Sequence, residues 1–145
     1  MKTQIILVRA FDRQTDRRAT ARKIVQMIES KEIRASHFVT ALDGGDSMIT
    51  QGDLWNASRE STHSVVRRGD LNHAENAWET LRGMLNGEPL IVIAGAAATD
   101  AILDIATNSS ANWLLKPGSC ACFEMNEYGH LVGDIETLLP IEHAN

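Results

Sequence analysis

Short, unbroken runs of branched apolar residues recur along the chain and alternate with segments of helical periodicity. In the clearest case, the run Leu90–Ala94 is followed by Gly95, three alanines and then apolar residues at helical spacing up to Thr107. Such a run is too short for a helix and is typical of a strand buried on both faces of a largely parallel sheet. We therefore predict a strand, a tight turn at Gly95 and a helix in this segment.

Further runs of strand length fit the same scheme, at residues 4–9, 37–42 and 64–67. Near the C-terminus, residues 119–125 and 130–136 read as two strands around a turn at 126–129, which predicts an antiparallel hairpin. The order of elements predicts one α/β domain over residues 1–145, a three-layer α/β/α sandwich with a mostly parallel sheet and the C-terminal antiparallel hairpin.

Helices are expected between these strands. One follows the capping side chains of Asp12, Thr15 and Asp16 and ends near Lys31. Another is expected to be capped by Asn72 and to end at residues 86–87. Residues 47–61 could form either a short helix or a packed loop, because a glycine in the middle of the segment argues against a regular element.

Composition excludes several classes of protein. The chain has 145 residues, of which 43% are hydrophobic and 23% charged, and its longest apolar run is far shorter than the roughly 18 residues of a membrane span. No cleavage site follows the first apolar run, so we expect a cytoplasmic protein without membrane contact. Cys120 and Cys122 are expected to be buried apolar fillers, and we expect no metal and no cofactor.

Charge is distributed unevenly along the chain. The net charge of −5 argues against a nucleic-acid-binding surface. A local basic group nevertheless stands at the start of the first predicted helix, formed by Arg13, Arg17, Arg18, Arg22 and Lys23.

Any binding site is expected at the carboxyl ends of the central strands. In open α/β sheets ligands bind there, where the first N–H groups of the following helix favour anions. Arg9 ends one predicted strand, while Gly95, Ala96 and Ala97 begin a helix after another. We predict that these four residues form an anion-binding site.

The layout of the chain resembles the histidine phosphatase (phosphoglycerate mutase-like) superfamily, and within it the short SixA-type phosphohistidine phosphatases. The resemblance rests on order and spacing and covers nearly the whole chain. The matching segments are ILVR at 6–9, the helix at 16–30, HFVTAL at 37–42, LIVIAG at 90–95 and the closing hairpin at 117–136. It implies a phosphate-handling fold whose nucleophilic histidine follows the first strand.

The catalytic residues of that family are absent here. Ala10 occupies the position of the nucleophilic histidine, and Phe11 that of a glycine beside the phosphate. Gly95, or Ala94 with a shift of one residue, stands where the second histidine is expected, and the family's second arginine has no counterpart in residues 43–46. Only Arg9 is retained, and Phe11 could fill the pocket outright.

Other polar residues could replace the missing groups. Five histidines remain, at positions 37, 63, 73, 130 and 143, and each is assigned a surface or capping role in preference to a catalytic one. Asp12, Asp43 and Asp46 fall in loops at the predicted ligand edge, where they could act as acids or bases, pair with Arg9, or simply make turns and caps.

Three functions follow from these observations. The first is a non-catalytic member of the superfamily that binds a phosphate-bearing small molecule, a phosphoprotein or another protein partner. The second is a residual phosphatase, acting on phosphohistidine or a phosphomonoester through a shifted histidine. The third is an unrelated doubly wound binding module, although the turn at Gly95 lacks the glycine spacing of a dinucleotide site.

Overall fold

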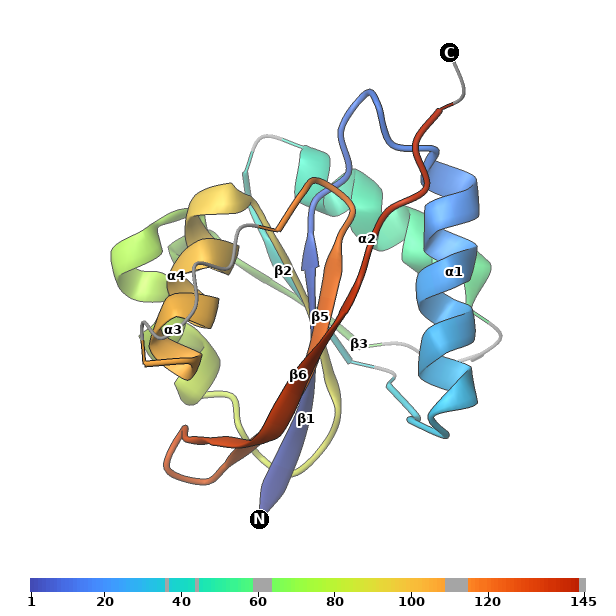
Figure 1. The fold of residues 1–145 in the computed structure, drawn as a ribbon. Helices are drawn as coiled ribbons and strands as arrows, with labels where there is room; N and C mark the ends of the chain where they lie inside the picture. Colours follow the sequence, from blue (N-terminus) through green and yellow to red (C-terminus); the bar gives the residue numbers. More distant parts are fainter. Residues whose placement is uncertain (36, 44, 59–63, 109–114, 144–145) are drawn as a thin grey trace.

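The computed structural model consists of a central sheet with helices on both faces (Figure 1). It describes residues 1–35, 37–43, 45–58, 64–108 and 115–143. The sheet has six strands in the order β3-β2-β4-β1-β5-β6. The strands are β1 (Lys2–Arg9), β2 (His37–Ala41), β3 (Ser64–Arg68), β4 (Leu90–Ala94), β5 (Cys120–Asn126) and β6 (Leu131–Leu138).

The sheet is parallel from β3 to β1, and its last two strands form the antiparallel hairpin that the sequence predicts. β4 pairs in parallel with both β1 and β2, and β5 runs antiparallel to β1 and to β6. β4 is buried along its whole length. The three-layer fold and the central position of Leu90–Ala94 are thereby confirmed.

Two helices cover each face of the sheet (Figure 1). α1 (Arg17–Ser30) and α2 (Asp46–Ala57) lie on one face, and α3 (Ala74–Arg82) and α4 (Ala96–Ala106) lie on the other. A short 3₁₀ helix, Gly69–Asn72, precedes α3. In the described part of the chain, no helix is both long and apolar enough to cross a membrane.

Alternate residues of the central strands supply two separate cores. Ile5 and Leu7 of β1 pack with α3 and α4, whereas Ile6 and Val8 pack with α1 and α2. This alternation is the period of a strand, and it explains why a strand covered on both faces reads as one continuous apolar run. The free thiols of Cys120 and Cys122 are buried in the core beside α1 and α2, as expected of apolar fillers.

The ends of several elements differ from the predictions. β1 begins two residues earlier than expected, β2 ends at Ala41, and the last strand is Leu131–Leu138 instead of 130–136. Residues 47–61, which allowed either reading, contain most of the helix α2, whose Gly52 meets no atom within 4 Å of an added Cβ. A glycine at such an open position costs a helix only about 1 kcal/mol.

The predicted limits of α3 were wrong at both ends. Asn72 belongs to the 3₁₀ helix, and its side-chain amide donates a hydrogen bond to the carbonyl of Leu42 instead of capping α3. His73 stands at the N-cap without a side-chain hydrogen bond, and the helix ends at Arg82, before Asn86. A long-range contact with the end of β2 therefore overrides the local capping preference of asparagine.

Gly118 determines how the chain returns to the carboxyl end of β1. Its φ is +82°, and an added Cβ would lie 3.0 Å from Cβ of Pro140 and 3.1 Å from Cγ2 of Thr15. The Gly118 N–H donates to the carbonyl of Arg9 at 2.9 Å. A side chain is thus excluded both by the backbone conformation and by the neighbouring atoms.

We expect Gly118→Ala to lower the free energy of unfolding by about 2 to 5 kcal/mol, the sum of left-handed strain and overpacking. Gly133→Ala is the matched control, because Gly133 also has a positive φ (+77°) but no atom within 4 Å of an added Cβ. It should cost only about 1 to 2 kcal/mol. Urea denaturation measures both, and equal losses would contradict a packing role for Gly118.

Candidate functional site

The carboxyl ends of β1 and β4 lie side by side, as the sequence predicts. Arg9 is in register with Ala94, and the Ala10 N–H donates to the Ala94 carbonyl at 3.0 Å. On the other side, the Arg9 N–H donates to the Ser119 carbonyl at 3.0 Å. Ala10 is only 8% exposed and is enclosed where the two strands end. A methyl group therefore stands at the position that the family resemblance assigns to a nucleophile.

The side chain of Arg9 lies on the face of the sheet that α3 and α4 cover. Leu7 and Ile5, two and four residues earlier on the same strand, belong to the core on that face. The guanidinium donates a hydrogen bond to the carbonyl of Leu115, and its charge acts on Asp100 of α4. It forms no ion pair with Asp12, Asp43 or Asp46 in the part of the chain that the structure describes.

The charge of Arg9 lowers the pKa of one acidic residue in α4, Asp100. Its Oδ1 atom is buried and has no hydrogen-bond partner among the described residues. Partial burial raises the pKa of the Asp100 carboxyl, against the Arg9 charge and a backbone hydrogen bond from Leu115, which both lower it. A carboxyl group in this setting holds its proton more tightly than an exposed aspartate.

Ser119 adds a second polar group to the same face. It is 1% exposed, and its hydroxyl has no partner among the described residues. Because Ala121 and Phe123, two and four residues later, pack in the α3/α4 core, Ser119 lies on the same face of the sheet as Arg9. Buried hydroxyls are normally hydrogen-bonded, so an unpaired one beside an arginine is a feature that a bound oxyanion or water could satisfy.

The start of α4 has the features predicted for Gly95, Ala96 and Ala97, but its surroundings are less favourable to an anion. Gly95 is the N-cap residue and no side chain caps the helix, so the N–H groups of its first turn remain available. However, Oδ2 of Asp43 lies 3.7 Å from the position of a Cβ on Gly95. The carboxylate of Asp43 therefore already faces this helix start.

The loop carboxylates make turn and cap hydrogen bonds. Asp12 Oδ1 accepts from the N–H groups of Gln14 and Thr15 at 2.9 and 3.1 Å. Asp43 Oδ1 accepts from the Ser47 N–H at 3.0 Å, at the start of α2, and Asp46 is the exposed first residue of that helix. These contacts account for Asp12 and Asp43 as turn and cap residues, while Asp46 stands in the first turn of a helix and not in a loop.

Phe11 is turned into the core beside α1 and α2. It is 4% exposed, and its ring edge lies 3.4 Å from the position of a Cβ on Gly118. Its N–H donates to Oγ1 of Thr50 at 2.9 Å. Because Arg9 lies on the opposite face of the sheet, the ring of Phe11 does not occupy the space beside the Arg9 guanidinium.

The structure places the histidines as follows. His37 starts β2 and pairs with Glu88 at 2.8 Å, His73 precedes α3, and His130 ends the turn before β6. His63 lies outside the described residues. The backbone N–H of His143 donates to the Gln14 carbonyl at 3.0 Å, which brings the tail to the loop after β1. Within the described residues, no group of three histidine, cysteine or acidic side chains could hold a metal ion.

Three members of the basic group of the sequence, Arg17, Arg18 and Arg22, line a cleft of about 630 Å³ between α1 and α2. Arg17 is engaged there by Asp53 through two hydrogen bonds of 2.7 and 2.9 Å, and this ion pair raises the pKa of the arginine. His143 also lines the cleft. This cleft borders the loop that leads from β1 to α1. Its arginines therefore lie toward the carboxyl ends of the strands, where the candidate site is.

Solved structures with the same fold include phosphatases and a mutase. SixA, a protein histidine phosphatase complexed with tungstate, has a TM-score of 0.74 and 11% identity, covering 94% of this chain and 97% of that one. A phosphoglycerate mutase from Plasmodium falciparum has a TM-score of 0.68 and 16% identity over 100% and 95% of the two chains. No protein-family model matches the sequence, and no curated protein matches it.

A third structure is a histidine-to-alanine mutant of phosphoserine phosphatase from Entamoeba histolytica in complex with phosphoserine. It has a TM-score of 0.56 and 12% identity, and the match covers 90% of this chain and 94% of that chain. The chain thus has the fold of the histidine phosphatase superfamily, and the resemblance seen in the sequence is confirmed at the level of fold.

Sequence reasoning missed Asp100 and Ser119. Asp100 lies one turn into α4 and could have been noticed as a polar residue among apolar ones, four residues after Ala96. The sequence does not indicate that the Arg9 side chain turns toward α4. Its hydrogen-bond acceptor, the carbonyl of Leu115, is 106 residues away in the sequence.

The raised pKa of Asp100 predicts a loss of stability with rising pH. Above the ordinary aspartate pKa of 3.8, the folded state keeps the proton that the unfolded chain releases, so the free energy of unfolding falls until the pH passes the folded pKa. Asp100→Asn should remove this loss. Its stability relative to the native protein should rise from about pH 3 toward pH 7, as measured by urea denaturation.

Asp104→Asn, an exposed change on the same helix, serves as the control for charge removal. A stability difference between Asp100→Asn and the native protein that does not change with pH would contradict the raised pKa.

Proposed function

We propose that this protein is a non-catalytic histidine phosphatase-like protein that binds a phosphate-bearing molecule at the carboxyl edge of β1 and β4. The observation that carries the proposal is the residue pair Arg9-Ala10, an arginine at the edge followed by a buried methyl group. The arginine retains the means to bind an oxyanion, and the alanine removes the means to accept a phosphoryl group.

The absence of a nucleophile argues against turnover. In this superfamily the phosphoryl group passes to a histidine, and alanine offers no atom that could take it. Positioning and charge alone accelerate phosphoryl transfer only when a nucleophile or an oriented water is in place. The second histidine position falls on Gly95, or on Ala94 with a shift of one residue, and neither has a side chain that could donate a proton to a leaving group.

Retained binding is supported by the groups around Arg9. The guanidinium meets a neutral carbonyl in Leu115, and the unpaired hydroxyl of Ser119 lies on the same face of the sheet. The phosphoserine complex of the histidine-to-alanine mutant is an example of this fold holding a phosphorylated compound with one histidine replaced by alanine.

The ligand is either a phosphate-bearing small molecule or a phosphoprotein. The α1/α2 cleft favours a phosphoprotein, because Arg18 and Arg22 stand one helical turn apart beside the loop that leads from Ala10. Acidic residues around a phosphorylated side chain could pair with them. A cytoplasmic location, where cysteines such as Cys120 and Cys122 remain reduced, fits such a partner.

We expect no hydrolysis of phosphohistidine or of common phosphomonoesters above background, and no phosphoenzyme after incubation with labelled phosphodonor. The physical reason is the lack of a nucleophile at Ala10. Release of inorganic phosphate and acid-labile protein-bound label measure the two quantities. Turnover that persists through repurification would overturn the proposal.

A residual phosphatase is the second candidate, and one observation favours it. The tail places His143 in the cleft that Arg18 and Arg22 also line. If turnover is found, His143→Ala should abolish it, whereas His37→Ala, which only breaks an exposed pair with Glu88, should not.

We expect tungstate or inorganic phosphate to bind at the β1/β4 edge, with chemical-shift changes confined to residues 9–12 and 94–100. Arg9→Ala should weaken binding about tenfold or more, since a charge-assisted contact contributes roughly 1.5 to 3 kcal/mol. Calorimetry measures the affinity. Arg34→Ala, which removes an exposed arginine from the loop before β2, is the control.

The same titration tests the role of Asp100. Ionised Asp100 competes with the ligand for Arg9, so binding should strengthen as the pH falls, while Asp100→Asn should bind more tightly and vary less with pH. Phosphate itself gains charge with rising pH, and tungstate condenses to polyoxoanions in acid. Sulfate keeps a constant charge over the tested range, so sulfate is the probe for this comparison. No response at millimolar oxyanion would contradict the proposed site.

A further inference from the structure

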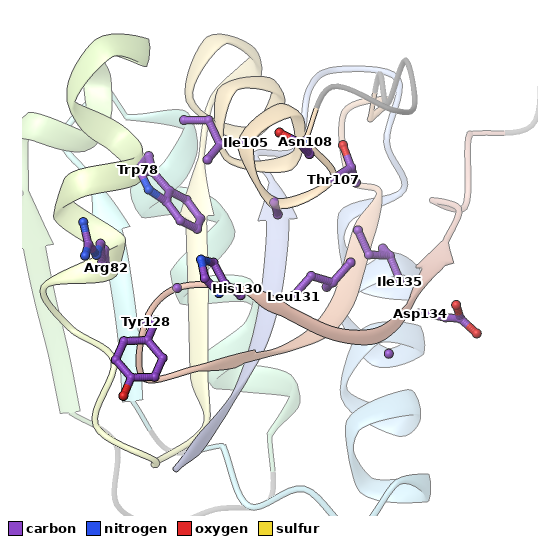
Figure 2. A pocket seen from close by; sticks show the side chains of 13 residues that line it. Trp78, Arg82, Ile105, Thr107, Asn108, Tyr128, His130, Leu131, Asp134 and Ile135 are labelled. Carbon is purple, nitrogen blue, oxygen red and sulfur yellow. The ribbon is translucent and has the colours of Figure 1, made fainter.

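A cleft of about 800 Å³ lies between the hairpin and the two helices α3 and α4 (Figure 2). We call it the hairpin cleft. Its apolar floor includes Ile105 of α4 and Leu131 and Ile135 of β6. Ile105 is 47% exposed although it is a large apolar residue. The cleft is separate from the carboxyl edge, because its lining does not include Arg9, Ala10, Gly95, Asp100 or Ser119.

The cleft exists because the helical layer ends before the sheet does. α3 and α4 pack on each other and cover the middle strands, whereas no helix in the described part of the chain follows β6. The inner side chains of β6 are only half-buried for that reason. An apolar strip of sheet at the foot of a cleft is thus left open to solvent.

Aromatic side chains form one end of the cleft. The indole of Trp78 points from α3 toward the hairpin, and the imidazole of His130 points from the hairpin into the same opening (Figure 2). A Cβ on Gly129 would lie 3.1 Å from Cζ2 of Trp78, so the indole is packed directly on the hairpin backbone. Tyr128 continues this wall and is 66% exposed.

The charged groups are segregated along the cleft. Arg82 stands at the aromatic end. Its Nη1 atom lies 3.9 Å from Oε1 of Glu79 on the same helix, which is too far for a hydrogen bond. Asp134 stands at the other end and points away from the rings in Figure 2. An incoming molecule therefore meets flat rings and an arginine together at one end, and apolar side chains along the floor.

We propose that the hairpin cleft binds an organic anion that carries a flat aromatic ring. The ring lies against Trp78 and over Ile105, where stacking and apolar burial favour it. The negative group lies toward Arg82 and His130, where the guanidinium supplies charge-assisted hydrogen bonds. A neutral ring would gain only the first of these two contributions.

The test uses two fluorescent probes of the same shape that differ in charge, 1-anilinonaphthalene-8-sulfonate and the neutral N-phenyl-1-naphthylamine. Arg82→Gln should weaken binding of the sulfonate about tenfold and change binding of the neutral probe less than twofold. Ile105→Glu places a carboxylate in the floor at an exposed position and should weaken both probes. Circular dichroism of each variant shows that the fold is retained.

Arg34→Gln is the matched control for loss of one positive charge, and it should leave both probes unaffected. Phosphate binding, measured by calorimetry, should be unchanged in Arg82→Gln. This result separates the hairpin cleft from the phosphate site, so either proposal can fail alone. Equal losses for Arg82→Gln and Arg34→Gln, or unchanged binding in Ile105→Glu, would overturn the assignment. Absence of saturable sulfonate binding up to the millimolar range would do the same.

Discussion

Three main-chain hydrogen bonds at the carboxyl end of β1 fix the positions of Arg9 and Ala10. The Arg9 N–H bonds to Ser119, the Arg9 carbonyl receives the Gly118 N–H, and the Ala10 N–H bonds to Ala94. The strand is therefore held on both sides up to its last residue. Because buried backbone groups must be paired, this arrangement cannot relax without cost. It presents the same two positions to the edge of the sheet whatever side chains they carry.

The fold could be predicted largely because its central strands are buried on both faces. Continuous runs such as Leu90–Ala94 leave little alternative to a strand in a parallel sheet. The predictions fail where a distant contact decides the outcome. Asn72 turns to the carbonyl of Leu42, and α2 forms despite Gly52, beginning where Asp43 bonds to Ser47. Neither contact is visible in the local pattern.

The candidate site could be predicted as a place but not as an arrangement of side chains. The edge where Arg9 and Gly95 meet follows from strand order alone. The direction of the guanidinium does not, because its acceptor, Leu115, reaches it only through the connection after α4. Phe11 shows the same limit. Its position in the sequence suggested that it could fill the pocket, whereas its ring packs on the opposite face of the sheet.

Arg9 differs from Arg17 and Arg68 in the group that accepts its hydrogen bonds. Arg17 meets the carboxylate of Asp53 through two hydrogen bonds, and Arg68 meets that of Asp70 in the same way, lowering the pKa of Asp70 to about 2. Among the described residues, the hydrogen-bond acceptor of Arg9 is instead the neutral carbonyl of Leu115. The neighbouring Asp100 forms no ion pair with Arg9 among the described residues, and burial raises the pKa of its carboxyl. An arginine kept at a sheet edge without a hydrogen-bonded carboxylate retains much of its attraction for an anion. Had Arg9 become merely structural after the loss of a nucleophile, a bidentate pair like that of Arg17 would have been the expected arrangement.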